Sequence, residues 1–135
     1  MIELDLNSSS PAYRCGRLLA VIESAQRLAI PGIKNTVVDR FYGTASTAPA
    51  SVFSRLLSGV RPHLSKLERD RPGAYYALQR RLEDILAGIS GFPRTLNLEE
   101  QGLFALGYYQ QLADLRTRKS EQPTNDETDQ LEGEN

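Results

Sequence analysis

A chain of 135 residues, 40% hydrophobic and 24% charged, has room for one soluble globular domain, and none of its apolar runs approaches the ~18 residues that a membrane-spanning helix needs. With one cysteine (Cys15) and one histidine (His63), the chain cannot form an intrachain disulfide or a zinc site of the usual four ligands. The single cysteine favours a reducing cytoplasm. We expect no metal and no other cofactor. The net charge of −1 hides an asymmetry between two parts of the chain. The acidic tail, residues 120–135, contains six acids and no base. The body, residues 1–119, contains eleven acids and sixteen bases, a net charge of +5.

The first predicted element is a helix over residues 11–29, after an acidic start that lacks the pattern of a signal peptide. Ser10 suits its N-cap, and Pro11 suits its first position because no N–H is needed there. Tyr13, Arg17 and Arg27 fall on the polar face of this helix, where we expect them to be exposed. The opposite face gathers the apolar side chains Cys15, Leu18, Leu19, Ile22, Ala25 and Ala29.

Two helices follow, over residues 35–43 and 49–70, joined by a connection of small residues. Asn35 or Thr36 would cap the first of them. Pro62 lies inside the second, and because proline cannot donate to the helical ladder we expect a kink near residues 58–59 or a split. The apolar stripe of the second comprises Phe53, Leu56, Leu57, Val60, Leu64 and Leu67.

A fourth helix is expected after the Pro72-Gly73 break, up to about residue 89, and a fifth from after Asn97 to about residue 119. Asn97 with Glu100 resembles a capping box. Five helices with short connections predict an all-α fold, a compact bundle over residues 1–119. The acidic tail over residues 120–135 has few apolar residues, so we expect it to be disordered. The buried face of the fourth helix comprises Tyr75, Leu78, Leu82, Ile85, Leu86 and Ile89.

The stretch NLEEQGLFALGYYQQ in the fifth helix contains two glycines, each of which costs ~1 kcal/mol of helix propensity relative to alanine. The expected reason for them is the close approach of a neighbouring helix, so we expect Gly102→Leu to disrupt the bundle. The predicted packed face comprises Leu98, Gly102, Ala105, Tyr109 and Leu112, widened by Phe104, Tyr108 and Leu115.

The sequence contains no clear catalytic pattern. His63 lies beside Pro62 on a helix flank, which indicates a surface histidine without a catalytic partner. Cys15 lies on an apolar face, which indicates a buried, inert thiol. No stretch has the spacing of a phosphate-binding loop. We therefore expect no enzyme activity.

The arginines are the stronger signal, because thirteen of the sixteen bases are arginine and its planar fork suits phosphate oxygens. A basic body predicts an anionic partner, and without a groove-reading helix the expected contact is with a nucleic-acid backbone. The alternative is a solvated surface with scattered salt bridges. Tyr13 and Tyr76 lie off the apolar stripes and either stack on a base or pack on the surface. The candidate contact residues are Arg55, Lys66 and Arg69 first, then Arg17, Arg27, Arg61, Arg80 and Arg81.

Three stretches resemble a known family: SPAYRCGRLLAVIESAQ, DRFYGTASTAPASVFSRLLSGVRPHLSKL and LNLEEQGLFALGYYQQ. Together they look like the C-terminal helical region of the type I-C CRISPR large subunit, over roughly residues 10–119. In that family the region is also made as a separate small subunit of the Cascade surveillance complex. Since the chain starts with its own methionine, it resembles the stand-alone small subunit, although a cut fragment with an added methionine would look the same.

The resemblance implies a helical bundle without catalytic activity, present in more than one copy per complex. Its implied partners are the backbone and large subunits with their guide RNA, further copies of itself, and target DNA including the displaced strand, with no membrane. Two functions therefore stay open. In the first, the subunit stabilises the R-loop by sequence-nonspecific contacts with the DNA backbone. In the second, it is a structural spacer that bridges other subunits without contacting DNA. The acidic tail is either a solubilising appendage or a competitor of DNA for the basic body.

Overall fold

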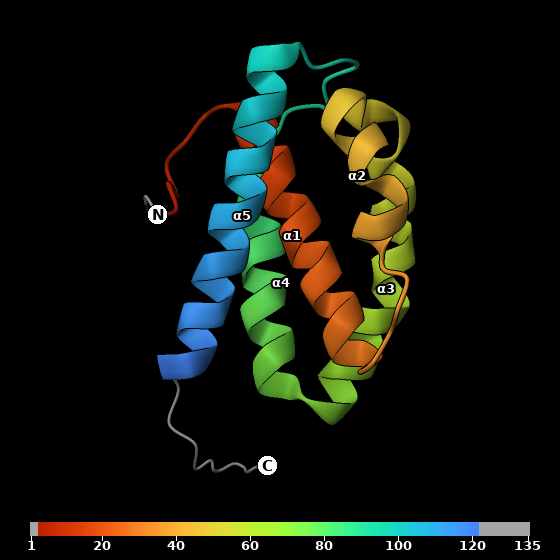
Figure 1. Ribbon diagram of the computed structural model, residues 1–135. Coiled ribbons are helices and arrows are strands. Elements are labelled where there is room, and N and C mark those ends of the chain that lie inside the picture. Colours follow the sequence, from red (N-terminus) through yellow and green to blue (C-terminus); the bar gives the residue numbers. More distant parts are fainter. Residues whose placement is uncertain (1–2, 122–135) are drawn as a thin grey trace.

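The computed structural model of the protein describes residues 3–121, and the side chains of residues 3–117. This part of the chain contains five α-helices, one short 3₁₀ turn and no strand, which confirms the predicted all-α bundle (Figure 1). None of its helices is both long and apolar enough to span a bilayer. In chain order the elements are α1 (Pro11–Ala29), α2 (Val37–Thr47), η1 (Pro49–Ser51), α3 (Phe53–Asp70), α4 (Pro72–Ala87) and α5 (Leu98–Glu121).

Helix α1 is the central element, because it packs against each of the other four helices. In Figure 1, α5 lies on one side of α1 and the α2–α3 pair lies on the other. The predicted apolar face of α1 is buried, from Cys15 to Ala29. The prediction that Tyr13 and Arg17 are exposed is wrong, since only 3% and 2% of their surfaces are accessible. Helix α5 covers this second face, so a helix that looks amphipathic in sequence is buried nearly all round.

Two glycines let α1 and α5 approach each other closely. A Cβ added at Gly16 of α1 would overlap the carbonyl oxygen of Phe104, and one added at Gly107 of α5 would overlap the carbonyl oxygen of Tyr13. Both obstacles are backbone atoms, which cannot rotate away. The expectation that Gly102 makes the close contact is wrong, because it is exposed and a Cβ there would meet nothing within 4 Å.

The packed face of α5 is therefore rotated relative to the predicted one. Leu98 and Tyr109, predicted to be packed, are 83% and 54% exposed. Phe104 and Tyr108, predicted only to widen the face, are buried together with Gln111. Glutamine is a polar residue in a hydrophobicity pattern, so the pattern alone does not place it in the core.

The interface between α1 and α5 is held by buried polar side chains. Arg17 donates from Nε to Oε1 of Gln111 at 2.8 Å. The Tyr108 hydroxyl donates to Oε1 of Glu23 at 2.6 Å, and Thr36 also donates to the Glu23 carboxylate, at 3.1 Å. Since buried polar groups are costly unless they are hydrogen-bonded, this network fixes α1, α5 and the start of α2 relative to one another.

The predicted helix caps agree with the structure better than the predicted helix bounds do. Thr36 forms a capping box with Asp39, as one of the two predicted caps, and Asn97 forms the predicted box with Glu100. Helix α2 continues past the predicted end at residue 43 because the small residues that follow it pack into the core. Helix α3 runs unbroken through Pro62, so of the two expected effects of this proline, a kink or a split, the split does not occur. The predicted tail lies outside the described residues from residue 122 on, and its first two positions belong to α5.

Candidate nucleic-acid interface

The three leading candidates lie along the outer side of α3. Arg55, Lys66 and Arg69 are all exposed, and their positions in a regular helix place them on one stripe. At 1.5 Å per residue, Arg55 lies about 17 Å from Lys66 and about 21 Å from Arg69 along the helix axis. Within the described residues neither Arg55 nor Arg69 forms an ion pair with a carboxylate. Arg61 is exposed on the same helix but points about 120° away from Arg55.

Lys66 already has a structural contact. Its Nζ donates to the carbonyl oxygen of Ala29, the last residue of α1, at 2.7 Å. A cation at this place complements the negative end of the helix dipole. Lys66 therefore ties α3 to the end of α1, and its remaining donors are what it can offer to a ligand.

Four other candidates have positions that do not favour a shared nucleic-acid surface. Arg17 is buried beside Gln111, and its burial, followed by the nearby Arg14, lowers its pKa, so we withdraw it as a contact residue. Arg27 pairs with Glu23 at 3.2 Å, and the half-buried Arg81 pairs with Asp114 at 3.4 Å. Arg80 is exposed, but it lies on α4 and outside the α3 stripe.

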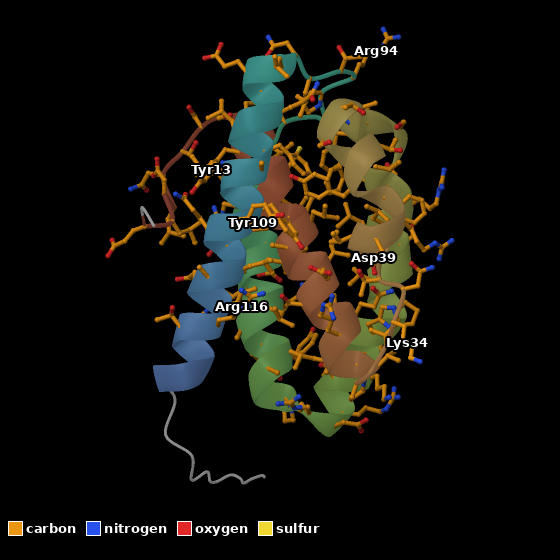
Figure 2. The ribbon with its side chains drawn as sticks, viewed as in Figure 1. Tyr13, Lys34, Asp39, Arg94, Tyr109 and Arg116 are labelled. Carbon is orange, nitrogen blue, oxygen red and sulfur yellow. The ribbon has the colours of Figure 1, made fainter. Side chains whose placement is uncertain are left out.

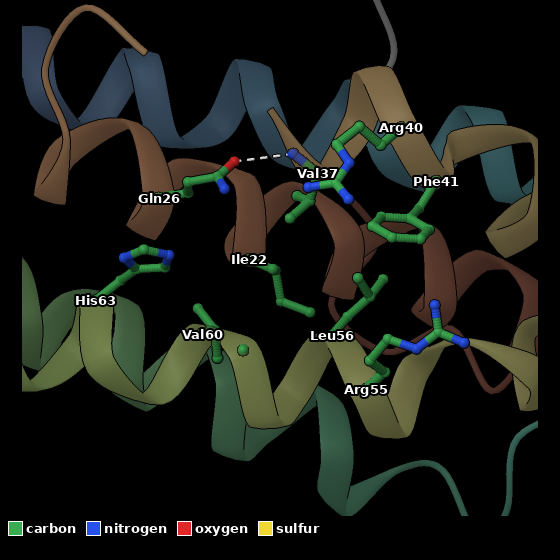
Figure 3. Close-up of a pocket in the computed structure, with 10 residues that line it drawn as sticks. Ile22, Gln26, Val37, Arg40, Phe41, Arg55, Leu56, Val60 and His63 are labelled. Carbon is green, nitrogen blue, oxygen red and sulfur yellow. Dashed lines mark hydrogen bonds between the residues drawn. The ribbon is translucent and has the colours of Figure 1, made fainter. Parts of the chain in front are cut away.

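A cleft between α2 and α3 adds two residues that were not singled out from the sequence. Arg40 and Phe41 of α2 face Arg55 of α3 across its mouth (Figure 3). The guanidinium carbons of Arg40 and Arg55 lie 5.2 Å and 5.7 Å from the centre of the Phe41 ring, within cation–π range. The cleft has a volume of about 250 Å³ and is lined by Ile22, Gln26, Val37, Leu56, Gly59, Val60 and His63 besides these three.

Arg40 follows Asp39 in the sequence, which suggests local neutralisation. In the structure the Asp39 carboxylate accepts a hydrogen bond from the backbone N–H of Thr36 at 3.0 Å, as part of the capping box of α2. The Thr-x-x-Asp pattern of residues 36–39 is readable in the sequence and predicts this assignment. This pattern indicates that the Asp39 carboxylate binds the start of α2. No signal in the sequence shows that Phe41 meets α3.

The α2–α3 side of the molecule is basic. Residues 34–70, which reach the end of α3, contain six bases and three acids, and two of the acids, Glu68 and Asp70, flank Arg69. We name Arg40, Arg55, Lys66 and Arg69 the basic face. Lys34 lies at the same side as α2 and α3, whereas Arg94 lies at the other end of the bundle (Figure 2). Charge of one sign on one face attracts an anionic partner and orients it.

His63 lines the cleft without adding to this charge at neutral pH. Partial burial, and then the neighbouring Lys66, lower its pKa below the ordinary value of 6.5. The imidazole is therefore neutral above that pH. It contributes a planar ring and hydrogen-bonding nitrogens to the cleft wall.

Of the two tyrosines proposed for stacking, one is accessible. The Tyr13 hydroxyl donates to Gln110 inside the bundle and accepts from the backbone N–H of Asp5 at 2.8 Å, so its ring is not available to a ligand. Tyr76 is 63% exposed on α4 and packs edge-on against Tyr75, with 5.0 Å between the ring centres. Tyr76 stays a candidate for a surface contact.

Cys15 is buried in the core of the bundle. Burial raises the pKa of the Cys15 thiol to about 12, so it is protonated and unreactive at neutral pH. Within residues 3–121 no three His, Cys, Asp or Glu side chains are close enough to hold a metal ion together.

The sequence was also compared with known proteins. One family model matches residues 1–116, and its description is CRISPR-associated protein (Cas_Csd1). No curated protein matches the chain.

Proposed function

Because the chain belongs to the Cas_Csd1 family of CRISPR-associated proteins, we propose that it is a non-catalytic small subunit of a type I-C Cascade complex in the cytoplasm. In this role the basic face holds a DNA strand of the R-loop through sequence-nonspecific contacts with its backbone. Base pairing with the guide RNA supplies the sequence specificity, and the protein supplies charge and shape. Its partners are the backbone and large subunits with their guide RNA, and further copies of itself.

The observation that carries this proposal is the basic face itself. Arg40, Arg55 and Arg69 are exposed, come from two adjoining helices, and have no carboxylate partner among the described residues. An arginine kept for stability normally has an acceptor, as Arg27 and Arg81 do. Guanidinium groups without a protein acceptor are suited to phosphate oxygens, which they bind in a bidentate way.

The experiment is a matched pair of double charge reversals in reconstituted complex. Arg55→Glu with Arg69→Glu changes the basic face. Arg94→Glu with Arg116→Glu makes the same change in charge at two exposed arginines that are not among the four of the basic face. Target-DNA affinity is measured at several salt concentrations. We expect the first pair to weaken binding and to reduce the slope of log affinity against log salt by about 0.7 per lost strand contact. Equal changes of DNA affinity and of its salt dependence in the two double variants would contradict the DNA role.

The spacer alternative has an observation of its own on α5. Leu98, Leu106 and Tyr109 are 83%, 43% and 54% exposed on α5, which lies beside α1 (Figure 1). Exposed apolar side chains that cluster on one face mark protein–protein contacts. Under this alternative the basic face meets acidic or RNA-bearing surfaces of other subunits, so the reversals at Arg55 and Arg69 abolish co-purification with those subunits instead of changing the salt dependence of DNA binding.

The role of the acidic tail and the absence of catalytic activity are tested separately. Deletion of residues 120–135 that raises DNA affinity would identify the tail as a competitor of DNA, and an unchanged affinity leaves the solubilising role. Nucleic-acid turnover by the purified chain, free of other subunits, would contradict the non-catalytic assignment.

A further inference from the structure

The α2–α3 cleft has more than charge to offer a ligand. Its inner walls are apolar, with Ile22, Val37 and Val60 among the lining residues. The Phe41 ring stands at its mouth between the guanidinium groups of Arg40 and Arg55 (Figure 3). An apolar hollow with an aromatic ring and cations on its rim matches the three parts of a nucleotide: a flat base, a sugar and a phosphate.

We propose that this cleft takes one unpaired nucleotide of a DNA strand, with its base between α2 and α3 and its flanking phosphates against Arg40 and Arg55. The inference rests on the proposed function, because it needs a strand at the basic face. It goes further, since it makes one contact with a base where the proposed function has contacts only with the backbone.

Size and charge favour this occupant over a segment of a protein partner. About 250 Å³ is below the ~300–1,000 Å³ of pockets for drug-sized ligands, so the cleft is closer in size to a single base than to a helix. None of the described residues that line the cleft is acidic, and Asp39, next to Arg40 in the sequence, accepts a hydrogen bond from the backbone N–H of Thr36. The rim is therefore cationic, which favours phosphate over the side chains of an ordinary protein surface.

The spacing of the two arginines fits a strand that passes across the mouth. Each guanidinium carbon lies within 6 Å of the same ring centre, so the two are no more than about 11 Å apart. Two like charges at this distance repel each other, and phosphates on either side of one nucleotide relieve the repulsion. Stacking on aromatic rings and on guanidinium planes is the usual means by which proteins hold unpaired bases, and it tolerates any base.

Gly59 provides a way to close the cleft without disturbing the fold. It lines the cleft, and a Cβ added there would meet nothing within 4 Å, so Gly59→Leu fills open space. Leucine also has the higher helix propensity of the two. Gly102→Leu is the matched control, because Gly102 is equally open and exposed but lies on α5. Circular dichroism checks that both variants stay folded.

The test measures affinity of the purified full-length protein, at low salt, for two single-stranded oligonucleotides of equal length. One carries ordinary bases and the other carries an abasic backbone with the same charge. We expect wild type and Gly102→Leu to bind the first at least about fivefold more tightly, the lower end of what one stacked base contributes. Gly59→Leu should bind both equally, with the affinity that wild type has for the abasic strand.

The outcomes separate this inference from the proposed function. Equal affinity of wild type for the two strands overturns the cleft site and leaves backbone binding intact. A preference for bases that Gly59→Leu retains also overturns it, because the base then binds elsewhere. Absence of binding to either strand counts against both proposals together.

Discussion

Gly107 of α5 lies so close to the carbonyl oxygen of Tyr13 in α1 that a Cβ could not be added without overlap. We expect Gly107→Ala to lower the free energy of unfolding by about 1–3 kcal/mol, because the backbone atoms cannot move aside as a side chain would. Gly102→Ala should have the opposite sign and raise stability by up to ~1 kcal/mol through helix propensity. Urea unfolding of the two variants measures both effects. A stabilised Gly107→Ala protein would contradict the close α1–α5 contact.

Two neighbouring tyrosines should differ sharply when each loses its hydroxyl. Tyr108 is buried and donates to Glu23, which is itself only 4% exposed, so Tyr108→Phe removes a hydrogen bond from a buried carboxylate. We expect a loss of about 1–3 kcal/mol. Tyr109 is 54% exposed, and Tyr109→Phe should stay within about 0.5 kcal/mol of wild type. Equal effects of the two substitutions would show that the Tyr108 bond adds nothing to stability.

His63 should make the stability of the protein depend on pH. Its pKa in the folded state is below the ordinary 6.5, because partial burial and then Lys66 disfavour the charged form. Below pH 6.5 the unfolded chain therefore binds the proton more readily than the folded one. The contribution is fully present above pH 6.5 and is lost as pH falls through the folded pKa.

The matching measurement compares wild type with His63→Gln, which cannot titrate, by urea unfolding at pH 7.5 and pH 5. Titration of the carboxylates affects both proteins alike. We expect the difference in unfolding free energy, wild type minus variant, to be smaller at pH 5 than at pH 7.5. A difference that is constant or that grows at low pH would contradict the lowered pKa.

Local patterns predicted much of the fold. The bounds of α1, the caps at Thr36 and Asn97, and the apolar faces of α1 and α3 depend on neighbours in sequence, so the sequence contains them. The surroundings of each helix are a different matter. The sequence pattern places Arg17 on a solvent-exposed face, but Arg17 is buried. A periodic pattern shows which side of a helix is more apolar, and it does not show how many helices pack around that helix.

The same limit applies to the candidate site. The α3 stripe of Arg55 and Arg69 follows from helix geometry alone and was predictable. The cleft depends on how α2 and α3 each pack on α1, because that arrangement brings Arg40 and Phe41 to Arg55. Arg81 could not be set aside from the sequence, since its partner Asp114 is 33 residues away along the chain. The pair of Arg27 with Glu23, four residues before it on the same helix, was readable in the sequence.

The most direct test of the DNA role replaces single positions with a benzophenone photo-crosslinking amino acid in target-bound complex. Position 58, occupied by the exposed Ser58, lies one residue before Gly59 on α3, and position 102, occupied by Gly102, lies exposed on α5. With radiolabelled target and displaced strands, we predict DNA crosslinks from position 58 and protein crosslinks without DNA from position 102. Crosslinks from position 58 to protein alone, with DNA captured from position 102, would contradict the assignment of the basic face to DNA.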